Sequence, residues 1–247
     1  MERAIIFDVD GTLAETEEGH RAAFNIAFQE AGLPWSWDQD IYGKLLAVTG
    51  GKERIRYFIE DFGAEGAPDE NLDVFIRKLH AKKTLAYTEI VRGGGLELRP
   101  GVRECIEEAR KRGYRLALAT TTTPANIDAL LAATFGDAGQ GLFDVICAGD
   151  SVPNKKPAPD VYLKALEELE LPAGRCVAIE DSRNGLLSAC AAGIATIVTP
   201  CLYTRGENFD EAALVLDNLN ALDFDAVEAL LRRLDRAGSL LTGRAIP

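Results

Sequence analysis

Two carboxylates follow an apolar run near the start of the chain. Ala4 to Phe7 is uninterrupted apolar sequence, typical of a strand buried on both faces, and Asp8 and Asp10 come after it. Residues two apart in an extended chain project to the same side, so both carboxylates face one place. Buried charge is costly unless it is compensated, which predicts a divalent cation with oxygen ligands, most naturally Mg²⁺. The alternative is a plain strand followed by an Asp-Gly turn, and the rest of the chain decides between the two.

Polar residues also stand where other predicted strands end and helices begin. They are Thr120 after the run 115–119, Glu180 and Asp181 after the run 176–179, and Lys156 in the segment before the helix 161–169. With further strands at 143–147 and 194–199, the alternation of strands and helices predicts an α/β fold with a doubly wound parallel sheet. Ligands of such sheets bind beyond the carboxyl ends of the strands. Several chemically suitable groups at that edge favour a functional site over chance.

Residues 16–92 have a different pattern, helical throughout and without a predicted strand. The predicted helices are 17–32, 38–47, 55–62 and 72–91. The composition changes at the glycines 93–95, where we place a domain boundary. The sequence therefore predicts a core of residues 1–15 and 93–235, an inserted helical cap of residues 16–92, and a tail of residues 236–247.

The composition is that of an acidic globular protein. The formal net charge of −12 over 247 residues argues against nucleic acid, whose binding needs basic groups. No apolar run reaches membrane-spanning length, and the five cysteines lack zinc-type spacing, which favours free thiols in a reducing compartment. A strand at the very start leaves no room for a signal peptide. We expect a cytoplasmic monomer with neither nucleic acid nor membrane partners.

The motifs, in this order, resemble those of the haloacid dehalogenase superfamily, in the branch whose helical cap follows the first motif. Asp8-Val9-Asp10-Gly11-Thr12 resembles the first motif, Thr120 the second, Lys156 the third and Glu180-Asp181 the fourth. The resemblance covers nearly the whole chain. Dehalogenases of the superfamily do not have the second aspartate, so Asp10 argues for phosphoryl transfer instead.

The resemblance implies a role for each of these residues. Asp8 would attack phosphorus and form an aspartyl-phosphate, and Asp10 would act as acid and then as base. Thr120 and Lys156 would bind the phosphoryl oxygens. Mg²⁺ would be held by Asp8, the backbone carbonyl of Asp10, and Asp181, with Glu180 directly or through a water.

Within the superfamily the cap is most similar to that of the CbbY group, which removes a phosphate from xylulose 1,5-bisphosphate, a by-product of rubisco. The cap residues that would bind the sugar and its second phosphate are Glu17, His20, Gly50, Gly51, Lys52, Arg54, His80, Lys82 and Lys83. Further candidates on the core side, beside Thr120, are Thr121, Thr122 and Asn126. Basic groups clustered on the cap of an acidic protein favour a substrate with a second anionic group.

Other functions share much of this pattern. A phosphomutase similar to β-phosphoglucomutase and a phosphatase for another small sugar phosphate are the alternatives within the superfamily. An alternative of another class is a catalytically silent sensor that binds a sugar phosphate or a partner protein. The intact pair Asp8 and Asp10 favours the enzyme, because a silent relative need not keep both.

Overall fold

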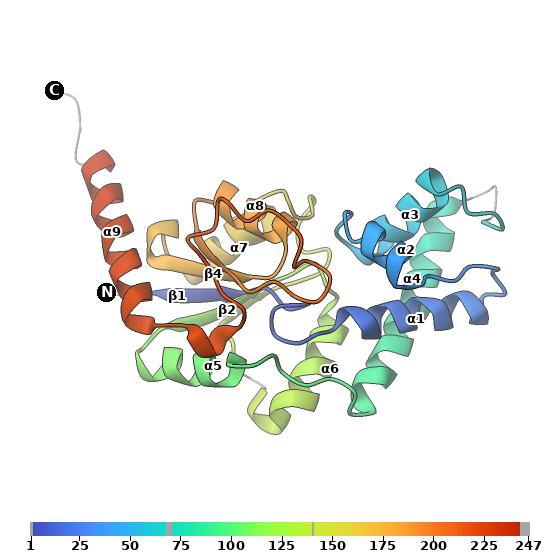
Figure 1. Ribbon diagram of the computed structural model, residues 1–247, viewed down its shortest axis with the longest axis horizontal. Helices are drawn as coiled ribbons and strands as arrows, with labels where there is room; N and C mark the ends of the chain where they lie inside the picture. Colours follow the sequence, from blue (N-terminus) through green and yellow to red (C-terminus); the bar gives the residue numbers. More distant parts are fainter. Residues whose placement is uncertain (1, 68–70, 140, 243–247) are drawn as a thin grey trace.

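The fold is built on a six-stranded parallel sheet (Figure 1). The computed structural model describes residues 2–67, 71–139 and 141–242, with side chains to residue 234. The strands are β1 (Ala4–Phe7), β2 (Arg115–Ala119), β3 (Val145–Cys147), β4 (Cys176–Glu180), β5 (Ala195–Val198) and β6 (Leu214–Val215). Their order is β3-β2-β1-β4-β5-β6. The predicted α/β fold is confirmed, and the sheet gains in β6 a two-residue strand that the sequence analysis did not predict.

The sheet register brings the predicted strand ends to one edge. Phe7 pairs with Leu118 of β2 on one side and with Ile179 of β4 on the other. Because the three strands are parallel, the residues that follow them lie side by side: Asp8, Thr120 and Asp181. β1 is therefore the central strand on which the site is built.

Helices cover both faces of the sheet, and the side chains of β1 alternate between them. Ile5 and Phe7 belong to the core shared with α5 (Val102–Lys111), α6 (Pro124–Phe135) and α9 (Phe224–Thr242). Ala4 and Ile6 pack with α7 (Asp160–Leu169) and α8 (Arg183–Ala191). Short 3-10 turns lie at Gly136–Gly139, Ala173–Arg175 and Leu219–Ala221. This two-faced burial explains why Ala4 to Phe7 are uniformly apolar.

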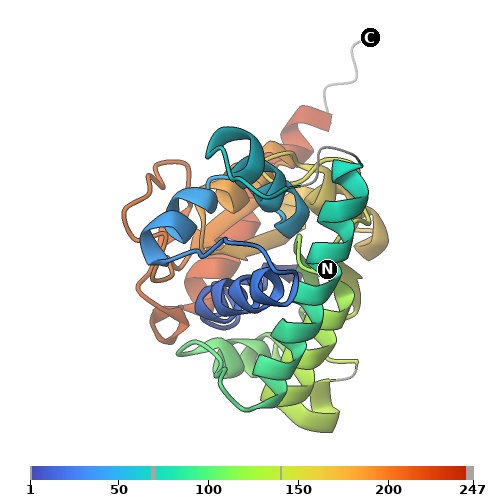
Figure 2. The same cartoon turned by 90° about the vertical axis from the view of Figure 1, so that its right-hand side faces the viewer.

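Residues 17–92 form four helices at one end of the sheet (Figures 1 and 2). They are α1 (Glu17–Glu30), α2 (Gln39–Leu45), α3 (Gly51–Asp61) and α4 (Leu72–Arg92). Their own core is aromatic, with Phe24, Trp37 and Phe58 among its buried members. α3 begins at Gly51, earlier than the predicted Ile55, because Gly50 adopts a positive φ of 100° and caps the helix. We call these four helices the cap below.

The chain enters and leaves the cap through two adjacent segments. Ala14 and Leu98 form an isolated antiparallel bridge, and the backbone N–H of Arg99 donates to the carbonyl of Leu13 at 2.8 Å. The loop after β1 and the segment that returns from the cap are therefore tied together.

The remaining sequence expectations concern the termini, the cysteines and the membrane. α9 continues to Thr242, past residue 235, and residues 243–247 of the predicted tail lie outside the described residues. The five cysteines are free thiols, four of them buried. Among the described helices, none combines the length and the apolar character needed to cross a membrane.

Candidate active site

Asp8 stands at the centre of the site, directly after β1. Its backbone N–H extends the sheet by donating to the carbonyl of Ile179 at 2.9 Å, and the residue is 7% exposed. Lys156 Nζ donates to Asp8 Oδ1 at 2.7 Å. Burial raises the pKa of Asp8 to about 8 in spite of the nearby Lys156 charge. The carboxylate is thus held in place by few partners and is poorly solvated.

Lys156 contacts two of the buried carboxylates, those of Asp8 and Glu180. Its ammonium group donates to Asp8, to Glu180 Oε1 at 2.6 Å and to the carbonyl of Ala119 at 2.9 Å. Burial would lower the pKa of Lys156, but the charges of Asp8 and Glu180 outweigh it and raise the pKa. Tyr162 donates its hydroxyl to the same Glu180 oxygen at 2.5 Å. Glu180 therefore holds Lys156 in place next to Asp8.

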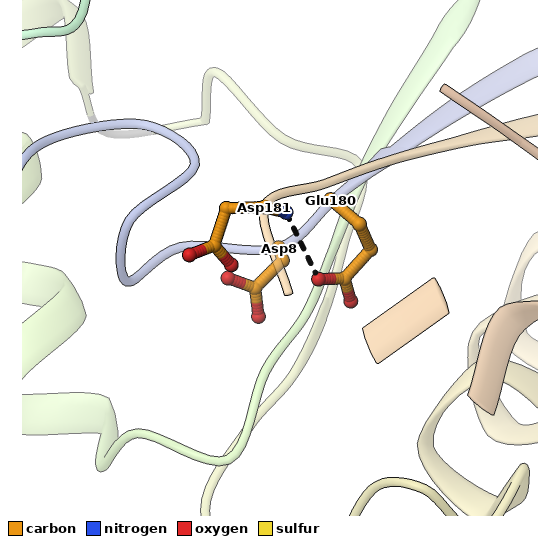
Figure 3. A group of neighbouring side chains, drawn as sticks. All are labelled: Asp8, Glu180 and Asp181. Carbon is orange, nitrogen blue, oxygen red and sulfur yellow. Dashed lines mark hydrogen bonds between the residues drawn. The ribbon is translucent and has the colours of Figure 1, made fainter. Parts of the chain in front are cut away.

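Asp8, Glu180 and Asp181 form a buried acidic cluster whose oxygens lie within 4.8 Å of one another (Figure 3). Burial raises the pKa of Asp181 well above its usual value, and the charges of Asp8 and Glu180 add to this. Lys156 supplies one positive charge to three carboxylates, so the cluster lacks compensation. Three buried carboxylate oxygens at this spacing fit a hard divalent cation such as Mg²⁺.

Two glycines make this crowding feasible. Gly11 has a φ of 79°, and a Cβ there would come within 2.2 Å of Asp181 Oδ2. A Cβ on Gly185, in the first turn of α8, would come within 1.9 Å of Glu180 Oε2. Because glycine has no Cβ, the backbone at these two positions can lie against the carboxylates of Asp181 and Glu180, where any other residue would collide with them.

Asp10 turns away from the acidic cluster and toward the cap. Its Oδ1 accepts hydrogen bonds from Thr16 Oγ1 at 2.7 Å and from His20 Nε2 at 2.9 Å. Burial would raise the pKa of Asp10, but the hydrogen bonds from His20 and Thr16 and the nearby charge of Lys83 outweigh it and lower the pKa. Asp10 is therefore ionised in this arrangement, which differs from the protonated form that a general acid needs.

The negative charge of Asp10 is compensated by the buried pair His20 and Lys83. Lys83 Nζ lies 2.8 Å from His20 Nδ1. Burial lowers the pKa of His20 from 6.5, and Lys83 lowers it further, whereas burial brings that of Lys83 to about 8. We therefore assign the positive charge to Lys83 and a neutral imidazole to His20. His20 then accepts from Lys83 at Nδ1 and donates to Asp10 at Nε2.

The loop after β2 forms a polar wall of the cavity beside Asp8. The backbone N–H of Thr122 donates to Thr120 Oγ1 at 3.2 Å, and Asn126 Nδ2 donates to Thr122 Oγ1 at 2.9 Å. Within the described part of the chain, Asn126 Oδ1 and Thr123 Oγ1 are buried without a hydrogen-bond partner. α6 begins here, so its N-terminal end also favours an anion.

The cap contributes a second polar cluster across the cavity. Arg54 donates to the Tyr42 hydroxyl at 2.8 Å, and that hydroxyl donates to Glu17 Oε2 at 2.5 Å. Arg54 is 8% exposed, and its Nε has no hydrogen-bond partner among the described residues. Arg54 also lies 3.9 Å from Glu17 Oε2, which partly compensates its charge, and its unpartnered Nε–H can donate to an anionic ligand.

Most of the predicted site residues line one cavity between the cap and the sheet edge. These are Asp8, Asp10, Glu17, His20, Gly50, Gly51, Arg54, His80, Lys83, Thr120, Thr121, Thr122, Asn126, Lys156 and Asp181. Glu180 lies behind Asp8 and Lys156 and reaches the site through them.

Two basic residues of the cap lie outside this wall. Lys52 forms an ion pair with Asp150 of the core, and Lys82 lies 4.0 Å from Glu30 on the outer surface of the cap. Burial lowers the pKa of His80, which does line the cavity, to about 3, so His80 is neutral. The cationic groups that face the cavity from the cap are thus Arg54 and Lys83.

A sequence model of the haloacid dehalogenase-like hydrolases matches residues 2–193. The chain belongs to this hydrolase family. It is 51% identical to the protein CbbY of Rhodobacter capsulatus over 228 residues, which make up 92% of this chain and 98% of that protein.

Solved structures extend this similarity. CbbY from Rhodobacter sphaeroides in complex with phosphate is 48% identical, with a TM-score of 0.85 and coverage of 90% of this chain and 96% of that chain. A variant of that protein in complex with xylulose 1,5-bisphosphate gives a TM-score of 0.84 at the same identity and coverage. The predicted resemblance to the haloacid dehalogenase superfamily and its CbbY group is confirmed.

The sequence analysis missed a part of the hydrolase cavity that is formed by the start of α8 and by the loop after β5. The residues concerned are Ser182, Asn184, Cys201, Thr204 and Glu207. Asn184 Nδ2 donates to the carbonyl of Ala47 at 3.1 Å and to Thr49 Oγ1 at 3.2 Å, so it joins the core to the cap. The rule that ligands bind beyond the carboxyl ends of parallel strands could have predicted the loop after β5.

Proposed function

We propose that this hydrolase is a Mg²⁺-dependent phosphatase that converts xylulose 1,5-bisphosphate to xylulose 5-phosphate through an aspartyl-phosphate. The observation that carries the proposal is one cavity lined by Asp8 and Lys156 of the core and by the buried cations Arg54 and Lys83 of the cap. A ligand with two phosphates can meet cations from both sides of this cavity. The complex of the R. sphaeroides CbbY variant with xylulose 1,5-bisphosphate supports the same substrate.

In the first step, an Asp8 oxygen attacks the phosphorus of one phosphate ester. The bond from phosphorus to the sugar oxygen breaks, and Asp10 gives its proton to the leaving alkoxide. Asp10 is ionised in the structure, so it must gain this proton as the substrate enters. The negative charge of the substrate raises the proton affinity of Asp10.

In the second step, water attacks the phosphorus of the aspartyl-phosphate. Asp10 takes a proton from that water, the bond between Asp8 and phosphorus breaks, and inorganic phosphate leaves. Lys156 and Thr120 bind the phosphoryl oxygens in both steps, where their charge and dipole stabilise the transition state. Mg²⁺, held by Asp8, Asp181 and the backbone carbonyl of Asp10, with Glu180 directly or through a water, would neutralise phosphoryl charge and orient the group.

The cap would select the substrate by binding what is not transferred. Arg54 would pair with the second phosphate, and Glu17 and His20 would bind sugar hydroxyls. Since a closed cap also excludes water, these contacts would affect kcat as well as KM.

The decisive experiment compares phosphate release from xylulose 1,5-bisphosphate, from sugar monophosphates and from p-nitrophenyl phosphate, with Mg²⁺ and with EDTA. We expect the bisphosphate to have the highest kcat/KM and EDTA to abolish all turnover. Arg54→Ala should reduce kcat/KM for the bisphosphate at least about tenfold more than for the aryl phosphate. Equal losses on both substrates would show that Arg54 does not bind a second phosphate.

The alternatives predict other outcomes of this experiment. A phosphomutase would interconvert hexose phosphates and release little inorganic phosphate. Preference for one monophosphate would indicate a phosphatase for another sugar phosphate. A sensor would bind the bisphosphate without turnover, with or without Mg²⁺.

A further inference from the structure

The side chain of Arg99 lies buried beside the catalytic loop and is not explained by the reaction above. It is 7% exposed, and its guanidinium donates to the carbonyl of Gly11. The same group donates to the Thr199 carbonyl at 2.6 Å, to Thr199 Oγ1 at 3.2 Å and to the Pro200 carbonyl at 2.8 Å. Its Nε lies 3.3 Å from Glu15 Oε1. One side chain thus joins the loop after β1 to the loop after β5.

Both of these loops contact Asp181. The backbone of Gly11 packs directly against the Asp181 carboxylate, since a Cβ at Gly11 would come within 2.2 Å of Oδ2. In the loop after β5, Thr204 Oγ1 donates to the Asp181 carbonyl at 2.7 Å and accepts from the Cys201 N–H at 2.9 Å. The loops that Arg99 joins therefore fix Asp181 from two sides.

The backbone of Arg99 adds a third connection. Its N–H donates to the Leu13 carbonyl at 2.8 Å, next to the bridge between Ala14 and Leu98. Arg99 is therefore also the residue at which the chain returns from the cap to the catalytic loop.

We propose that Arg99 is a positioning residue for the metal site, holding the loops after β1 and β5 at the spacing at which Asp8 and Asp181 share one cation. The inference rests on the Mg²⁺ site of the proposed function. A planar guanidinium with five N–H groups can bind acceptors on two loops at once, whereas the ammonium of a lysine cannot reproduce this geometry. Residues that orient metal ligands commonly affect metal affinity about 10- to 100-fold when they are replaced.

The test measures Mn²⁺ binding, by electron paramagnetic resonance of the free ion, to the full chain and to Arg99→Met. We expect Arg99→Met to raise the dissociation constant at least about tenfold and Arg99→Lys to give an intermediate value. Arg103→Met is the matched control, because Arg103 also donates to a backbone carbonyl, that of Thr134, but on the exposed surface of α5. It should bind Mn²⁺ as the parent does.

Activity gives a second measurement. In Arg99→Met the Mg²⁺ concentration for half-maximal activity should rise about as much as the dissociation constant, while kcat at saturating Mg²⁺ stays within about threefold of the parent. Lower thermal stability with unchanged metal affinity would overturn the inference and leave Arg99 a structural residue. If Arg99→Met does not fold, the affinity of Arg99→Lys decides, and parental affinity overturns the inference. Failure of the parent to bind Mn²⁺ would instead overturn the metal site of the proposed function, and this inference with it.

Discussion

At the scale of single residues, the site is a problem of buried charge. Lys156 is the one cation in direct contact with Asp8 among the described residues, and it also pairs with Glu180. Burial dominates the pKa of Asp8 and raises it to about 8, so without a cation Asp8 is largely protonated at pH 7. The cation of the proposed function would lower this pKa and so supply the carboxylate that attacks phosphorus. A poorly solvated carboxylate is a better nucleophile toward phosphorus than one that water surrounds.

Asp8→Asn should abolish turnover and leave the fold intact. The amide keeps the volume of the side chain and an oxygen that can accept from Lys156, but it cannot form the aspartyl-phosphate. We expect kcat to fall more than about 100-fold, which corresponds to roughly 2.7 kcal/mol or more in the barrier. Steady-state kinetics and circular dichroism check this. Activity above about one hundredth of the parent would exclude the covalent mechanism.

Lys83 should make recognition of the bisphosphate depend on pH. Burial lowers its pKa from 10.5 to about 8, so the ammonium loses its proton as the pH rises through 8. kcat/KM for xylulose 1,5-bisphosphate should therefore fall above pH 8. The free energy of unfolding changes in the opposite direction. Below pH 8 the folded chain bears the cost of burying the Lys83 charge, and as the pH rises above 8 Lys83 loses its proton and the folded chain becomes more stable.

Lys83→Gln tests this assignment. The variant should have a lower kcat/KM at pH 7 and should lack the decrease that begins near pH 8. A decrease above pH 8 that persists in the variant would assign the titration to another group. p-Nitrophenyl phosphate serves as the control substrate, because Lys83 also acts on Asp10 through His20. An equal decrease above pH 8 for the aryl phosphate would assign the titration to Asp10 and not to recognition of a second phosphate.

At the scale of elements, the sequence predicted what depends on local pattern. β2 has the predicted bounds, and β4 is one residue longer than the predicted 176–179. These strands were recognisable because burial on both faces requires uninterrupted apolar residues. β6 was not predicted because it has two residues, both exposed, and its pairing with β5 is decided by the chain around it.

Positions that depend on packing between helices could not be predicted from the sequence. Tyr42 is fully buried in the aromatic core of the cap. Nothing in its local sequence indicates that its hydroxyl contacts residues of the site. In the fold its hydroxyl joins Glu17 of α1 to Arg54 of α3. Lys82 and Lys83 are neighbours in sequence, yet one lies on the surface and the other in the cavity.

Tyr42→Phe should weaken substrate selection while keeping the cap folded. Without the hydroxyl, Arg54 and Glu17 lose their common hydrogen-bond partner and keep only their direct contact at 3.9 Å, which holds both side chains less firmly. We expect KM for the bisphosphate to rise about 5- to 30-fold, in line with roughly 1 to 2 kcal/mol for a buried hydrogen bond. kcat/KM for the aryl phosphate should change less than about twofold. Tyr57→Phe, on the partly buried side of α3, is the matched control, and an equal effect there would contradict the role of Tyr42.

At the scale of the whole molecule, core residues contact the cap around the mouth of the cavity. Asn184 donates to Thr49, Tyr203 donates to Glu18, and Lys52 pairs with Asp150. The partners are 135, 185 and 98 residues apart in sequence, so no local pattern could predict them. They indicate a closed arrangement of cap and core.

The structure gives Lys52 a contact with the core, whereas the sequence analysis proposed that it binds substrate. If the ion pair with Asp150 is its main function, Lys52→Met, Asp150→Asn and the double variant should have the same kcat/KM for the bisphosphate. Each should lie within about threefold of the parent, since exposed ion pairs contribute roughly 0 to 1 kcal/mol. A loss in Lys52→Met that greatly exceeds that in Asp150→Asn would restore Lys52 as a substrate ligand.

The cation should stabilise the whole fold, because it binds the folded chain at the cluster of buried carboxylates and offsets the cost of burying their charge. At about 100 times its dissociation constant, Mg²⁺ would add roughly 2.7 kcal/mol. For a chain of this length that corresponds to an increase in Tm of about 5 to 10 °C.

Asp181→Asn should lose this increase in Tm. Without metal, however, it should be at least as stable as the parent, because it removes one of the buried charges. Asp137→Asn, on the exposed surface, should behave as the parent in both conditions. Differential scanning calorimetry with Mg²⁺ and with EDTA checks these values, and a full Mg²⁺ effect in Asp181→Asn would show that the cation binds elsewhere.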